Sequence, residues 1–262
     1  MPPTEFPRVN ALLDWLLPAW QATLTANLIG VYLHGSLVSG DYDDALSDVD
    51  LVTVLERDPT EADIEGLRPL HADLVARFPH WDNRVEVAYI SRRALGVFQT
   101  EVSPIGIISP GEPLHRVQAG IDWLMNWYRV REDGVILLGP SPAEFIPPIS
   151  FADYVACVRD HLLGWRGYNP PADSHHGSLA YVVLTLCRGL RTVQEGVAGS
   201  KVQAAAWAKV AFPEWAGLIE QALVWRSRMH EYGVYADLPV EDVAQFVAFG
   251  VDRVVGNPNQ ED

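Results

Sequence analysis

Cysteine and long apolar runs are scarce in this 262-residue chain, and each scarcity excludes a class of protein. Its two cysteines are too few for a disulfide framework and lack the spacing of a metal site, so we expect a reduced, cytoplasmic protein. No apolar run approaches the ~20 residues that a membrane-spanning helix needs, so we expect no membrane partner. The first residues contain no basic segment followed by an apolar one, and we therefore expect no secretory signal.

Basic side chains are also in short supply. The chain has 19 Lys and Arg against 34 Asp and Glu, which gives a net charge of −15. Such a surface repels nucleic acid, so we expect no nucleic-acid partner. It attracts cations, whether metal ions or a polyamine-like substrate, although the acidity could equally serve solubility alone. The sequence does not determine the oligomeric state, and our working expectation is a monomer.

The chain does contain a clear change of pattern near its middle. Three apolar runs are typical of strands in one mixed sheet, and they cover residues 28–33, 49–55 and 84–90. Residues 10–26 have the apolar spacing of a helix, and we expect another helix near 60–77, between the second and third strands. From about residue 118 the pattern becomes helical, and four further apolar stripes follow a proline-rich stretch from Gly139 to Pro148. We therefore predict an α+β protein with a sheet domain at 1–148 and an α-helical bundle domain at 149–262.

One segment of the first half has the residue types of a metal and phosphate site. Gly35 and Ser36 end the first predicted strand, and Asp48 and Asp50 begin the second after eleven intervening residues. Residues i and i+2 of a strand point to the same face, so the two carboxylates lie side by side and repel each other. A divalent cation relieves this repulsion. Mg²⁺ binds one or two protein carboxylates and keeps positions for water and substrate phosphates.

The residues around this acidic pair indicate what the site does. Gly35 allows a close backbone approach, and Ser36 adds a hydroxyl at the start of a turn, which together make a cradle for a polyphosphate. Glu86 is a polar position in the alternation of the third strand and brings a third carboxylate, suited to a metal neighbour and general base. Such a set indicates phosphoryl or nucleotidyl transfer. Each feature alone also occurs on ordinary solvated surfaces, but their order along the chain favours the site.

These residues, from Leu33-His34-Gly35-Ser36 to Asp48-Val49-Asp50-Leu51, resemble the signature of the nucleotidyltransferase superfamily that includes DNA polymerase beta-like enzymes. Two later segments are similar to the helical domain of aminoglycoside 3''-adenylyltransferases, enzymes of antibiotic resistance that modify streptomycin and spectinomycin. These segments are Tyr181 to Arg188 and Gly199 to Trp207. The resemblance implies a polymerase-beta-like N-terminal domain, with ATP and Mg²⁺ bound in a cleft between the two domains. It also implies transfer of AMP to a hydroxyl of a small cationic substrate, with release of pyrophosphate.

The resemblance further implies roles for individual residues. It implies that Asp48, Asp50 and Glu86 bind the metal and that Glu86 is the catalytic base. Five residues are assigned to nucleotide binding: Gly35, Ser36, Ser47, Arg188 and Lys201. The local pattern agrees for Lys201, because Ser200 and Gln203 form a capping box that starts a helix there. A cation in that turn opposes the helix dipole unless an anion is bound. Plain solvated side chains are the alternative for both Lys201 and Arg188.

The chain departs from the family pattern on the acceptor side. Ser178 stands where the family has an acidic residue that contacts the drug, and Tyr181 replaces a family histidine. Trp165 matches a family tryptophan near the substrate, and Asp173 is a candidate replacement for the missing carboxylate. We therefore assign four residues to substrate binding: Glu86, Trp165, Asp173 and Ser178. Two alternatives stay open: a nucleotidyltransferase acting on a protein or RNA acceptor, as in toxin–antitoxin systems, and a nucleotide-binding module without turnover.

Overall fold

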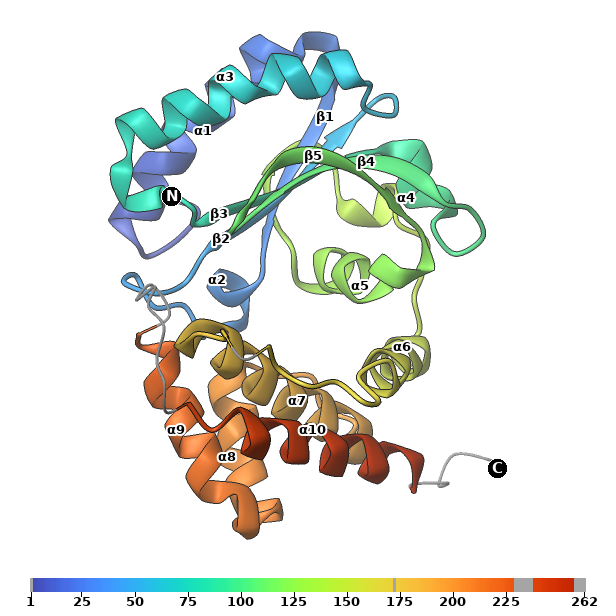
Figure 1. Cartoon of the computed structure of the whole chain (residues 1–262). Helices are drawn as coiled ribbons and strands as arrows, with labels where there is room; N and C mark the ends of the chain where they lie inside the picture. The colour runs from blue at the N-terminus through green and yellow to red at the C-terminus, as the bar shows by residue number, and fades with distance from the viewer. Residues whose placement is uncertain (1, 172, 229–237, 257–262) are drawn as a thin grey trace. The chain divides into compact units, whose positions relative to one another are not determined.

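The computed structural model describes residues 2–171, 173–228 and 238–256. These residues form two compact units, which divide between Ile149 and Ser150 (Figure 1). The first unit contains a six-stranded sheet with helices on its faces, and the second is built from helices alone in its described part. The predicted α+β class, with a mixed-sheet domain followed by a helical part, is confirmed.

The sheet of the first unit has the strand order β5-β4-β3-β2-β1-β6. Its strands are β1 (Leu28–His34), β2 (Val49–Leu55), β3 (Val85–Ser91), β4 (Ser103–Ser109), β5 (Glu112–Ala119) and β6 (Val135–Leu138). β2 and β3 run parallel, whereas the other neighbouring pairs run antiparallel. The helix α3 (Glu61–Arg77) connects the parallel pair, as a parallel connection requires.

Helices cover the two faces of this sheet differently (Figure 1). α1 (Pro7–Leu24) and α3 lie on one face, where alternate strand residues such as Leu33, Val49 and Val87 pack into their core. α3 begins at a capping box formed by Thr60 and Asp63. The other face carries α4 (Arg92–Val97) next to β3 and α5 (Leu124–Asp133) next to β1. The short α2 (Ser36–Ser39) follows directly at the end of β1.

The predicted strands and helices of the first half lie within a few residues of the observed ones. The sequence did not predict β4, β5 and β6. The burial pattern of β5 explains part of this difference, because its outward residues are exposed and the strand lies at the sheet edge. The helix expected from about residue 118 begins later, at Leu124, since residues up to Ala119 belong to β5.

The second unit consists of helices packed around α7 (His176–Glu195). The others are α6 (Phe151–Leu163), α8 (Lys201–Ala211), α9 (Ala216–Arg226) and α10 (Val240–Val255). α10 approaches α7 closely at Gly250, where a Cβ atom would lie 2.7 Å from Leu186 Cδ1. α8 begins at the capping box of Ser200 and Gln203 that the sequence predicted. In the described residues, we find no helix with both the length and the apolar character needed to cross a bilayer.

Candidate active site

Strand register places two of the three predicted acidic residues side by side. Asp50 on β2 is the Cα partner of Glu86 on the parallel strand β3, and it is also the partner of His34 at the end of β1. Paired residues of neighbouring strands point to the same face. The buried Val49 packs into the α1 and α3 core, so Asp50 points to the opposite face. Asp48 comes immediately before β2, and both aspartates are half-buried.

Gly35 lies directly against the carboxylate of Asp50. A Cβ atom at position 35 would lie 1.8 Å from Asp50 Oδ2 and 2.6 Å from Asp50 Cγ. The backbone of Gly35 also has φ +71°, a conformation that residues with side chains rarely adopt. Ser36 follows as the first residue of the single turn α2. The group that lies against the bare backbone of Gly35 is therefore the carboxylate of Asp50, and the predicted contact of Gly35 with a polyphosphate stays a prediction.

The third residue in this row is neutral at physiological pH. Burial and, to a smaller extent, the positive charge of Arg129 on α5 together lower the pKa of His34 to about 4. His34 therefore adds no positive charge beside Asp50 near pH 7. Arg129 itself pairs with Asp133 one turn along α5, at 2.8 Å. The sequence pattern assigns no role to either residue, although His34 lies inside the Leu33–Ser36 motif.

The loop from Asp41 to Asp48 is held by contacts within the first unit. Ser47 is buried, and its hydroxyl accepts a hydrogen bond from Asp43 N at 3.0 Å. Arg84 donates to the carbonyl oxygens of Ser47 and Asp44. Ser47 thus has a structural contact inside the loop, and its predicted contact with the nucleotide stays a prediction. Nothing in the spacing of the motif indicated Arg84, whose partners are backbone atoms of a distant loop.

The two basic residues predicted to bind the nucleotide lie in the second unit. Arg188 is exposed on α7, seven residues after the exposed Tyr181, so both lie on the same face of that helix. Lys201 is the first residue of α8, and its ammonium lies 5.1 Å from the centre of the Tyr181 ring. The family position that holds a histidine therefore supplies an aromatic partner for Lys201 in this chain.

The residues assigned to the acceptor also lie in the second unit. Trp165 is half-buried and packs against its core, with the ring of His161 at 5.4 Å. Burial lowers the pKa of His161, and the charge of Arg188 lowers it further. Asp173 is exposed in a turn before α7. Ser178 contributes to the cap of α7, because its hydroxyl donates to His175 O at 2.8 Å. This hydroxyl therefore stabilises the start of the helix, and its contact with a substrate stays a prediction.

The residues around Asp50 suit a hard divalent cation. Asp48 and Asp50 offer carboxylate oxygens, the ligand type that Mg²⁺ prefers, and the space beside Gly35 lets a carboxylate sit against bare backbone. Among residues 2–171, 173–228 and 238–256, no three His, Cys, Asp or Glu side chains form a group ready to hold a metal. A Mg²⁺ site needs only one or two protein carboxylates, because water and phosphate oxygens complete it.

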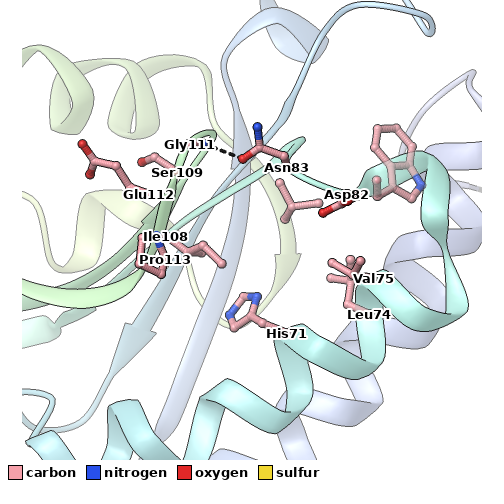
Figure 2. A pocket seen from close by; sticks show the side chains of 12 residues that line it. His71, Leu74, Val75, Asp82, Asn83, Ile108, Ser109, Gly111, Glu112 and Pro113 are labelled. Atoms are coloured by element: carbon pink, nitrogen blue, oxygen red, sulfur yellow. Dashed lines mark hydrogen bonds between the residues drawn. The ribbon is translucent and has the colours of Figure 1, made fainter. Parts of the chain in front are cut away.

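A cavity of about 330 Å³ lies in the first unit, between α3 and the β4–β5 hairpin (Figure 2). His71 from α3, Asp82 and Asn83 before β3, and Glu112 from β5 contribute polar groups to its wall. The cavity is on the α3 side of the sheet, whereas Asp50 and Glu86 point to the other face. Its lining contains none of the residues predicted to bind metal, nucleotide or acceptor.

Comparisons with known proteins find a matching family model for each half of the chain. The family model described as "Nucleotidyltransferase domain" matches residues 15–104, and the model "Aminoglycoside adenylyltransferase, C-terminal domain" matches residues 144–251. A similar solved structure is spectinomycin adenyltransferase AAD(9) from Enterococcus faecialis, crystallised with ATP and spectinomycin. The TM-score is 0.72 at 20% identity over 94% of this chain and 98% of that chain, which shows a shared fold. A comparison with curated protein sequences gives no match.

Proposed function

We propose that the chain is an aminoglycoside adenylyltransferase, which transfers AMP from ATP to a hydroxyl of an aminoglycoside or aminocyclitol, because its two halves match a nucleotidyltransferase domain and the C-terminal domain of that family. Streptomycin and spectinomycin are the proposed acceptors, and pyrophosphate is the second product. The observation that carries the proposal is the register of β2 and β3, which puts Asp50 beside Glu86, with the backbone of Gly35 against the Asp50 carboxylate. We further propose that the enzyme acts in the cytoplasm as a monomer and binds neither nucleic acid nor membranes.

The side chains of the first unit have distinct parts in this reaction. Asp48 and Asp50 would hold Mg²⁺, with Glu86 as its neighbour. When bound, the metal would orient the ATP phosphates and offset their negative charge. Glu86 accepts the proton of the acceptor hydroxyl. The acceptor oxygen forms a bond to the α-phosphorus. The bond from that phosphorus to the oxygen bridging the α- and β-phosphates breaks, and pyrophosphate leaves with its electron pair.

We propose that Gly35, Ser36, Ser47, Arg188 and Lys201 bind the nucleotide. The chemistry of the two basic residues supports this assignment, since each presents a cation suited to phosphate oxygens. Arg188 is exposed on α7, and Lys201 begins α8 after a complete capping box. A cation at that position favours a bound anion, because it otherwise opposes the helix dipole.

The acceptor is assigned by charge and by likeness. A protein with a net charge of −15 attracts cationic substrates, and Asp173 presents an exposed carboxylate. The solved structure that resembles this chain was crystallised with spectinomycin, so spectinomycin is a natural first test. We propose Trp165, Asp173 and Ser178, together with Glu86, as the acceptor-binding residues.

Incubation with separate acceptors tests this proposal. We expect that purified protein with ATP and Mg²⁺ adds one AMP unit to streptomycin or spectinomycin, detected by mass spectrometry, with matching release of pyrophosphate. Glu86→Gln is the control, because loss of a general base lowers kcat by roughly 10²–10⁴-fold while ATP still binds. Failure to release pyrophosphate with a broad aminoglycoside panel would contradict the proposal. Label from ATP in a macromolecular band of a lysate would favour a protein or RNA acceptor.

A further inference from the structure

Arg84 is a buried cation with unusual partners. Its residue is only 5% exposed, yet one guanidinium nitrogen donates to two backbone carbonyl oxygens, Ser47 O at 2.5 Å and Asp44 O at 3.1 Å. The other terminal nitrogen lies 3.0 Å from His80 Nε2, and the guanidinium carbon lies 5.2 Å from the centre of the Trp81 ring. The guanidinium is therefore fixed on several sides, and its two hydrogen bonds to backbone carbonyls are directed at one loop.

The backbone of the same residue holds the other side of that loop. Val49 N donates to Arg84 O at 2.9 Å. Asp48 is therefore flanked by two contacts with Arg84, one from the side chain to Ser47 and one from the main chain to Val49. Glu86 follows two residues later on β3. Through Arg84, the backbone at Asp48 is fixed relative to the strand that carries Glu86.

We propose that Arg84 is a positioning residue, which holds Asp48 in register with Asp50 and Glu86 so that the loop is ready to bind Mg²⁺ with ATP. This inference rests on the proposed function, because it assumes that Asp48 is a metal ligand. Arg84 acts through the backbone and does not touch the reacting atoms.

Arginine is suited to this position because its guanidinium group is planar and carries several donors. A guanidinium is a planar fork with five donors and can reach two carbonyls and a ring at once, whereas a lysine ammonium is a compact point charge. Arg8 offers an internal contrast, because it contacts the same loop only through an exposed ion pair with Asp44, at 2.8 Å. Exposed pairs of this kind contribute little, so we expect the loop to depend on Arg84 and hardly on Arg8.

Two substitutions separate geometry from charge. Arg84→Lys keeps the charge and loses the fork, while Arg84→Met also removes a positive charge, which by electrostatics alone would strengthen cation binding. We expect both variants to bind Mn²⁺ in the presence of ATP about tenfold more weakly than wild type, as measured by electron paramagnetic resonance. We also expect kcat to fall about tenfold or more, with KM for the acceptor nearly unchanged. Arg68→Lys, an exposed position on α3 paired with Glu65, is the matched control.

The outcomes distinguish this inference from the proposed function. A folded Arg84→Lys with wild-type Mn²⁺ affinity and kcat overturns the inference and leaves the function intact. If the variants bind Mn²⁺ more weakly but the wild-type protein transfers AMP to no acceptor, the positioning role of Arg84 is supported and the proposed function is contradicted. Absence of Mn²⁺ binding by wild type overturns both.

A measurement on the wild-type protein keeps the inference testable if the variants do not fold. Amide hydrogen exchange of residues 41–48 without metal reports whether the loop is ordered in advance. We expect clear protection before Mn²⁺ is added, with little change afterwards. Exchange at the rate of an unstructured peptide would overturn the inference.

Discussion

At the scale of single residues, the proposed site depends most directly on the missing side chain of Gly35. Gly35→Ala would drive a Cβ atom to 1.8 Å from Asp50 Oδ2, so the carboxylate must move. Because φ is +71° and ψ is −143°, outside the left-handed helical region, the substitution also strains the backbone by about 1–3 kcal/mol. We expect adenylyl transfer to fall by roughly 100-fold, since displacement of a catalytic group by about 1 Å has that effect. Steady-state rates of pyrophosphate release measure it.

Gly40 provides the control for that prediction. It shares the positive φ of Gly35, at +73°, but its ψ of 25° places it in the left-handed helical region, and a Cβ atom there would meet nothing within 4 Å. Gly40→Ala therefore introduces strain from a positive φ, smaller than at Gly35, without contact with a carboxylate, and we expect it to lower the melting temperature but to keep most of the activity. Equal loss of activity in both variants would show that backbone strain, and not the Asp50 contact, explains the defect.

The residues of the candidate site differ in how far the sequence could predict them. Alternation along strands and the spacing of the motif were enough to expect Asp50 and Glu86 on one face, because register follows from buried neighbours. Arg84 and Tyr181 could not be expected in their observed contacts. The partners of Arg84 are carbonyl oxygens some forty positions away, and those of Tyr181 depend on how two helices pack. Such tertiary contacts leave no local periodicity in the sequence.

At the scale of elements, the sequence predicted helices best where a short local pattern determines the start of the helix or its buried face. The cap at Ser200 and the apolar stripe of α7 each follow from one short pattern. No short sequence pattern predicts the strands β4 to β6. Their positions in the sheet depend on antiparallel pairing with neighbouring strands that are already in place. The polar outward positions of β5 also hide its alternation.

Three elements of the first unit meet at one buried polar contact. Trp20 Nε1 on α1 donates to Tyr89 Oη on β3 at 2.8 Å, and that hydroxyl lies 2.7 Å from His71 Nε2 on α3. Burial lowers the pKa of His71 to about 4. An unfolded histidine has an ordinary pKa near 6.5, so between pH 6.5 and 4 the unfolded state binds more protons than the folded state. Stability therefore falls as pH falls through this window, by up to ~1.4 kcal/mol per pH unit from His71.

Urea unfolding at pH 7, 6 and 5 measures this dependence. We expect His71→Gln, whose side-chain oxygen can still accept from Tyr89, to have a shallower slope than wild type. The contribution of His34, whose pKa is also lowered to about 4, remains in the variant. Identical slopes for the two proteins would show that His71 is not the titrating group.

The contact between α7 and α8 is a second prediction at this scale. The Tyr181 ring lies under the Lys201 ammonium at an exposed position, where a cation–π contact is worth about 0.5–1 kcal/mol. If that contact holds Lys201 in place for the nucleotide, Tyr181→Leu should raise KM for ATP roughly two- to fivefold. Tyr181→Phe keeps the ring and should leave KM for ATP near the wild-type value. Equal KM values for the Leu and Phe variants would contradict this role of the ring.

At the scale of the whole molecule, each unit has its own apolar core. Leu51 is fully buried in the core of the first unit, and Leu186 is fully buried in that of the second. Because a domain with a separate core can unfold as a cooperative unit, we expect the two units to respond separately to core damage. Replacing either leucine with alanine should destabilise its own unit by about 2–5 kcal/mol.

Native-state hydrogen exchange by mass spectrometry can follow both units in one experiment. In Leu51→Ala we expect faster exchange in β1 and β2, with α7 unchanged, and in Leu186→Ala the reverse. Each variant is the matched control for the other, because both remove the same side chain from a site with 0% exposure. Parallel loss of protection in both units with either variant would show that the chain unfolds as one cooperative body. The proposed metal-binding residues lie in one unit and Arg188 and Lys201 in the other, and the two sets would then belong to one cooperative unit of stability.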